Sequence, residues 1–125
     1  MHENDTAKII VDCAFHIHTK LGPGLLESVY EKVLEHEVTK RGLSVVTQQP
    51  WPVVWETVRL DIGFRADMIV GGKVVVEIKS VEAVAPVHPK QLRTYLRLMD
   101  LKLGLLINFN TPLIKDGITL VVNNL

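Results

Sequence analysis

Residues 103 to 109, Leu-Gly-Leu-Leu-Ile-Asn-Phe, form a nearly continuous apolar run. A run without polar alternation is typical of a β-strand that is covered on both of its faces. A sheet that contains such a strand needs a packed layer on each side. We therefore expect an α/β fold in which helices flank a central sheet.

Two helices are predicted before the sheet begins. Apolar residues recur at helical spacing from 9 to 21, after cap candidates at Asn4, Asp5 and Thr6, and the pattern stops at Gly22-Pro23-Gly24. A second apolar stripe, from 26 to 38, ends at Lys40-Arg41-Gly42, where basic residues and a glycine indicate a helix C-terminus.

From residue 43 onward, Val, Thr and Trp in alternation predict strands. Pro50 and Pro52 indicate an edge or a bulge. A third helix is expected from about Pro86–Pro89 to Asp100. The candidate strands cover residues 45–49, 53–55, 58–62, 66–70, 73–80, 103–109 and 118–122. The order is ααβ…βαβ with no linker, which predicts a mixed sheet in a single domain over residues 1–125.

Charge and hydropathy restrict the classes of partner. Fourteen basic residues balance fourteen acidic ones, so no overall positive field attracts nucleic acid, which counts against a tight autonomous DNA binder. No apolar run is long enough to cross a bilayer, which predicts a cytoplasmic protein without a membrane partner.

An acidic pair is the first candidate site. In the strand predicted over Lys73 to Ser80, the two-residue period places Glu77 and Lys79 on one face. Asp67 lies on the preceding strand, and the turn decides its partner. A two-residue turn at Gly71-Gly72 would pair Asp67 with Val76, whereas a three-residue loop would pair it with Glu77. We expect the longer loop or a bulge.

Two neighbouring carboxylates repel each other unless a cation or a proton lies between them. Such an oxygen-rich pair suits Mg²⁺ or Mn²⁺. Asp, Glu and Lys are nevertheless common on exposed strands, so this pattern alone is a weak signal.

Further motifs along the chain add a specific resemblance to a known family. The chain resembles the GxxExxY family, which is assigned to the PD-(D/E)xK nuclease superfamily, and the order of its motifs resembles RecB-like and Cas4-like nucleases. The resemblance covers about residues 5 to 122. It rests on Gly24-Leu-Leu-Glu27-Ser-Val-Tyr30, Gly63-Phe-Arg-Ala-Asp67, Glu77-Ile-Lys79, Pro86-Val-His88, Gln91-Leu-Arg-Thr-Tyr95 and Leu105-Leu-Ile-Asn-Phe-Asn110.

The resemblance implies a restriction-endonuclease-like core and Mg²⁺- or Mn²⁺-dependent hydrolysis of nucleic acid, with DNA as the expected substrate. It implies that Asp67 and Glu77 bind the metal, with the Ile78 carbonyl as a further ligand and Glu27 as a third carboxylate ligand or a contact through water. Lys79 would position the attacking water. Gln91 would orient Lys79 or the nucleophile, and Tyr95 would support the site or hold a phosphate.

Each of these residues also has an ordinary structural interpretation. Glu27 fits the first turn of a helix, where a glutamate interacts favourably with the helix dipole. Gln91 and Tyr95 fit the margin of an amphipathic helix. The aromatic residues Trp51, Trp55 and Phe64 are expected to pack against the sheet. The candidate substrate contacts, which also fit a solvated helix face or a helix start, are Arg65, His88, Lys90, Arg93 and Arg97.

Two other functions remain open. The chain could be an interaction module that keeps the nuclease fold without turnover, which its zero net charge favours. It could also be a nuclease subunit that a protein partner or homodimerisation activates.

Overall fold

Two helices come first in the computed structural model, which describes all residues from 1 to 125. Helix α1 spans Glu3–Leu21 and helix α2 spans Glu27–Lys40. The cap predicted at Asn4, Asp5 or Thr6 is wrong, because His2 caps α1. The His2 side chain accepts the Asn4 N–H, and the Asp5 side chain accepts the His2 N–H, which completes a capping box.

A mixed five-stranded sheet forms the centre of the molecule, in the order β1-β4-β5-β6-β7. Strands β5 and β6 are parallel, and every other neighbouring pair is antiparallel. The strands are β1 (Val45–Thr47), β4 (Met68–Val70), β5 (Val74–Lys79), β6 (Leu103–Asn108) and β7 (Ile118–Val122), with a short 3₁₀ helix, η1 (Ile114–Gly117), before β7. This agrees with the predicted α/β core.

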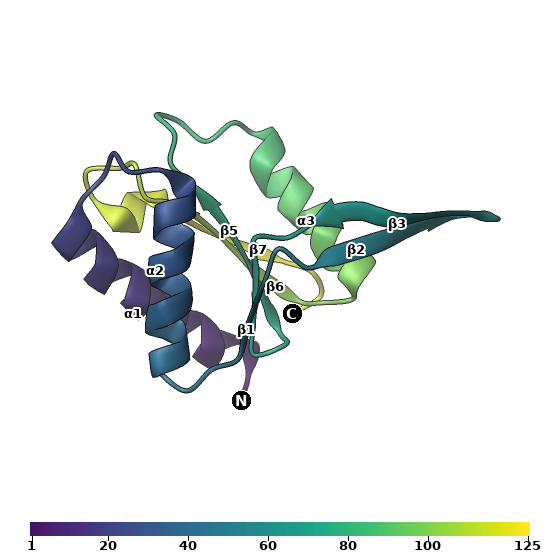
Figure 1. The fold of residues 1–125 in the computed structure, drawn as a ribbon, viewed down its shortest axis with the longest axis horizontal. Coiled ribbons are helices and arrows are strands. Elements are labelled where there is room, and N and C mark those ends of the chain that lie inside the picture. Colours follow the sequence, from purple (N-terminus) through teal and green to yellow (C-terminus); the bar gives the residue numbers. More distant parts are fainter.

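Helices cover both faces of the sheet (Figure 1). Helices α1 and α2 pack on the face that carries Val74, Val76 and Ile78. Helix α3 (Val87–Met99) packs on the other face, against Val75. All six residues of β6 are buried, which confirms the strand predicted from the apolar run.

A close approach lets α3 lie on the sheet. A Cβ atom added at Gly104 of β6 would lie 2.9 Å from Cγ and Cδ2 of Leu92 in α3. Leu92 is fully buried at this contact. Glycine is therefore the residue that allows Leu92 to pack directly on the β6 backbone.

Strands β2 (Pro50–Trp55) and β3 (Val58–Arg65) form a separate two-stranded antiparallel sheet, which projects from the body as an arm (Figure 1). The register shifts between Trp51 and Val53, as the nearby prolines predicted. Trp51 and Phe64 pack against the core on the α3 side. Trp55 is 73% exposed, so the prediction that it packs against the sheet is wrong, because the arm carries it beyond the body.

None of the helices combines the length and the apolar character that a membrane span requires.

Candidate active site

The hairpin between β4 and β5 sets the geometry of the acidic pair. Val70 pairs with Val74, and the three residues between them form the loop. Gly71 and Gly72 have φ of 61° and 66°, a left-handed conformation that glycine adopts without strain. Met68 pairs with Val76, so the same register places Asp67 level with Glu77. The predicted three-residue loop is confirmed.

Asp67 and Glu77 are joined through the backbone. The Asp67 N–H donates to Glu77 Oε2 at 2.8 Å, and the Ile78 N–H donates to Asp67 Oδ2, also at 2.8 Å. Strand β4 begins one residue later, at Met68. The Asp67 carboxylate therefore accepts the amide N–H of Ile78 in β5 at a position beyond the last backbone pair of β4 and β5. The two carboxylates are thus held side by side on the α3 face of the sheet.

Glu77 is only 7% exposed, and its environment disfavours the ionised form. Burial raises its pKa from 4.5 to about 8, and the neighbouring Asp67 charge contributes to this rise. The hydrogen bond from the Asp67 N–H and the charge of Lys79 act in the opposite direction and are weaker. Without a cation, the pair therefore holds a proton at neutral pH.

Gln48 also contacts the pair, although the sequence analysis did not identify it. It follows β1 in a left-handed conformation with φ of 53°. Its Nε2 donates to Asp67 Oδ1 at 3.0 Å and to Glu31 Oε1 at 2.9 Å, and its N–H donates to the Asp67 carbonyl at 3.1 Å. No local motif marks this residue, because its partners lie 17 and 19 positions away along the chain.

Tyr95 brings α3 to the acidic pair. Its ring stacks on Phe64 with the centroids 4.2 Å apart. Partial burial raises the pKa of Tyr95, and the nearby charges of Glu77 and Asp67 raise it as well. Lys79 is half-buried on the same face as Glu77, whereas Gln91, one turn before Tyr95, is exposed.

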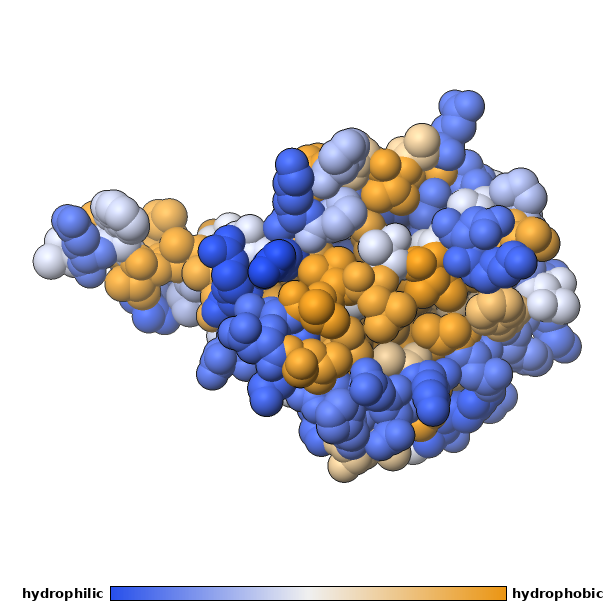
Figure 2. All heavy atoms as spheres, turned by 180° about the vertical axis from the view of Figure 1, so that it is seen from behind, coloured by the Kyte–Doolittle hydropathy of each residue, from blue (hydrophilic) through white to orange (hydrophobic).

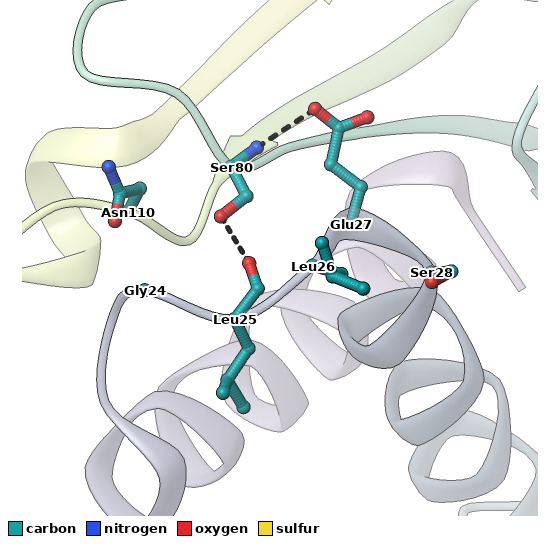
Figure 3. A pocket seen from close by; sticks show the side chains of 7 residues that line it. All are labelled: Gly24, Leu25, Leu26, Glu27, Ser28, Ser80 and Asn110. Atoms are coloured by element: carbon teal, nitrogen blue, oxygen red, sulfur yellow. Dashed lines mark hydrogen bonds between the residues drawn. The ribbon is translucent and has the colours of Figure 1, made fainter.

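Glu27 approaches from the opposite layer. It is the first residue of α2, and its Oε2 accepts the Ser80 N–H at 3.2 Å, just beyond the end of β5 (Figure 3). The Ser80 hydroxyl donates to the Leu25 carbonyl at 2.6 Å. A pocket of about 540 Å³ opens beside these contacts and is lined by Gly24, Leu25, Leu26, Glu27, Ser28, Ser80 and Asn110.

Asn108 fixes the chain where it leaves β5. Its Nδ2 donates to the Val81 carbonyl at 2.9 Å, and its Oδ1 accepts the Val81 N–H at 3.1 Å. The side chain is 2% exposed. This paired contact holds the segment after Lys79 in place, so that Ser80 meets Glu27.

The structure does not gather the three carboxylates into one group. No cluster of three or more His, Cys, Asp or Glu side chains is close enough to hold a metal ion. Asp67 and Glu77 are together, whereas Glu27 lies at the end of the strand.

A family model described as the PD-(D/E)XK nuclease superfamily matches residues 4–121. The chain belongs to this superfamily. No curated protein and no solved structure gives a significant match.

Nucleases of the superfamily typically use divalent metal ions. The acidic pair fits such an ion, because two hard oxygen donors lie side by side and the charge of Asp67 opposes ionisation of Glu77. Oε2 of Glu77 accepts the Asp67 N–H, which leaves Oε1 for another ligand. The positive charge of a divalent ion would remove the free-energy cost of ionising Glu77.

The five candidate substrate residues occupy different places around this superfamily core. Arg65 is exposed at the end of β3, two residues before Asp67, and His88 is half-buried in the first turn of α3. Lys90 and Arg93 line a pocket beside β7, two strands away from β5. Arg97 is exposed and donates to the Thr94 hydroxyl. Lys90 and Arg93 are therefore not brought to the acidic pair.

Proposed function

We propose that this protein is a metal-dependent nuclease that hydrolyses phosphodiester bonds of nucleic acid, with DNA as the substrate. The observation that carries the proposal is the Asp67–Glu77 pair, in which Glu77 is buried and Asp67 half-buried, with Lys79 on the same face of the sheet. Within the superfamily, we assign the chain to the GxxExxY family on its Gly24-to-Tyr30 motif.

The carboxylates of Asp67 and Glu77, with the Ile78 carbonyl, are the groups that would hold Mg²⁺ or Mn²⁺. Glu27 is separate from the pair, so its contact with the ion would run through water. When bound, the ion polarises the phosphate and lowers the pKa of the attacking water.

The remaining roles belong to side chains around the pair. Lys79 positions the attacking water and stabilises the charge that develops on the phosphate. Gln91 orients Lys79 or the nucleophile from its exposed position on α3. Tyr95 holds its place through the stack on Phe64 and supports the site from the side opposite the sheet.

Five residues are proposed as substrate contacts, at different distances from the Asp67–Glu77 pair. Arg65 is the last residue of β3, and His88 lies in the first turn of α3. Either side chain can contact a phosphate or a base edge. Lys90, Arg93 and Arg97 would hold phosphates further along a bound strand, since Lys90 and Arg93 lie beside β7. Neutralising one such phosphate contact should weaken binding similarly for all sequences.

Two variants test the assignment. Glu77→Ala and Lys79→Ala should each abolish metal-dependent cleavage of labelled single-stranded, duplex or branched DNA and RNA, while circular dichroism shows an intact fold. Lys115→Ala, at an exposed lysine of η1, is the matched control and should cleave like the wild type. Full activity in both site variants would reject the proposal.

A binding module without turnover is the second candidate, which the balanced charge favours. Thermal melting with Mn²⁺ and with EDTA, each repeated in the presence of DNA, separates the two functions. If the protein is a nuclease, Mn²⁺ should raise its melting temperature and the protein should cleave nucleic acid. A module is stabilised by Mn²⁺ or DNA, and no nucleic acid is cut under any condition.

A further inference from the structure

The arm formed by β2 and β3 has no covering layer beyond Trp51 and Phe64, which pack against the core. Its two strands pair only with each other, so each has an unpaired outer edge. A two-stranded sheet alone is marginally stable in water, and unpaired strand edges are ready templates for another strand. The arm therefore has the properties of an element that is completed by a partner.

Large apolar side chains are exposed along this arm. Val58, Leu60 and Ile62 alternate on one face of β3 and are 55%, 57% and 56% exposed. Trp55, which pairs with Val58, is 73% exposed. Figure 2 shows the apolar side chains on the arm where it extends from the body. Contiguous exposed apolar surface of this kind marks an interaction site.

The stretch of β3 from Val58 to Ile62 contains one basic and one acidic residue between its apolar residues, so its charges cancel. Arg59 and Asp61 point to the opposite face and form an exposed ion pair, with Nε and Oδ1 2.9 Å apart. Because the pair is neutral, this stretch has no net attraction for a phosphate backbone. An exposed ion pair contributes little by itself, so both charges are free to exchange partners.

We propose that the arm is a dimerisation element, in which β3 pairs antiparallel with β3 of a second copy about a twofold axis at Leu60. The sequence from 58 to 62, Val-Arg-Leu-Asp-Ile, is self-complementary in this arrangement. Antiparallel pairing about Leu60 sets each Arg59 opposite Asp61 of the second copy, and each Val58 opposite Ile62. Opposite charges directly across an antiparallel pair are stabilising.

The pairing joins the two arms into one four-stranded sheet. Trp55, Val58, Leu60 and Ile62 of both copies lie on one face of this sheet, whereas Val54, which pairs with Arg59, lies on the other. Twofold symmetry makes the interface the same on both copies, which is the usual geometry of a homodimer. It leaves the Asp67–Glu77 pair of each copy outside the interface, because Asp67 lies beyond the body end of β3. The proposal is thus independent of the nuclease activity.

Charge reversal tests the register directly. Arg59→Asp places two acidic residues opposite each other at both symmetric positions, and Asp61→Arg places two basic residues there. The dissociation constant of each single-variant dimer should be roughly tenfold or more above that of the wild-type dimer, because like charges directly opposite are destabilising. An equimolar mixture of the two variants should form a heterodimer, in which every acidic residue faces a basic one.

Sedimentation velocity across the soluble concentration range measures these states. The wild type and the double variant Arg59→Asp/Asp61→Arg should both sediment as dimers. Circular dichroism should show the same fold for all variants, since both positions are exposed. A wild type that is monomeric at every concentration, or single variants that dimerise like the wild type, would overturn the proposal.

A control at an edge strand of the main sheet identifies the interface. Leu120 of β7 is 58% exposed on the edge strand of the main sheet. Leu60→Asp should yield a monomer, and Leu120→Asp should leave the dimer unchanged. A dimer lost only in Leu120→Asp would assign dimerisation to β7 and refute the arm as the interface.

Discussion

Glu77 should make the metal-free protein less stable as the pH rises, and Glu77→Gln should remove this dependence. The carboxyl is buried beside Asp67, so folding raises its pKa from 4.5 to about 8. The native state therefore binds a proton that the unfolded chain has lost across this interval. The contribution of this group to stability is greatest below pH 4.5 and declines as the pH rises toward 8.

The magnitude follows from the same pKa difference. Each pKa unit corresponds to about 1.36 kcal/mol, so the wild type should lose on the order of 5 kcal/mol across this interval. The loss comes from one group that is almost fully buried. The amide introduced by Glu77→Gln keeps an oxygen that can accept the Asp67 N–H, and it never ionises.

Urea unfolding of both proteins in EDTA, at several pH values from 4.5 to 9, measures the difference in their free energies of unfolding. Taking the difference cancels the contribution of every other titratable group, because both proteins contain the same ones. We expect the wild type to lose several kcal/mol relative to Glu77→Gln between pH 4.5 and 8, and nothing further above pH 8. Parallel stability curves would refute the raised pKa of Glu77.

Two other variants test contacts around the core. Gln48→Ala should weaken Mn²⁺ binding about tenfold in calorimetry, because it frees Asp67 Oδ1 from the amide that orients it; unchanged affinity would remove Gln48 from the site. Gly104→Ala should lower the free energy of unfolding by about 1–3 kcal/mol, because the new Cβ would lie 2.9 Å from Leu92. An unchanged urea midpoint would contradict this prediction and would show that α3 can shift without a loss of stability.

Much of the core could be predicted from local pattern. The apolar run of β6 indicated a strand covered on both faces, and all six of its residues are buried. The two glycines at 71 and 72 left two registers open. The need to place Asp67 beside Glu77 selected the three-residue loop that the structure contains.

The remaining features depend on contacts that no local pattern encodes. The arm leaves the body, so the apolar character of Trp55 did not predict burial. Gln48 reaches Asp67 only after β1 pairs with β4. The distance of Glu27 from the acidic pair depends on how α2 docks at the end of β5, which is set by tertiary packing rather than by the Gly24-to-Tyr30 motif.

The most direct test of the account is a Mn²⁺ titration of wild type and Lys79→Ala in which metal binding and cleavage of one labelled DNA are measured on the same samples. We predict that both proteins bind Mn²⁺ with similar affinity, because Asp67 and Glu77 are unchanged, and that only the wild type cleaves. Cleavage by Lys79→Ala at the wild-type rate, or the absence of Mn²⁺ binding to the wild type, would contradict the central claim.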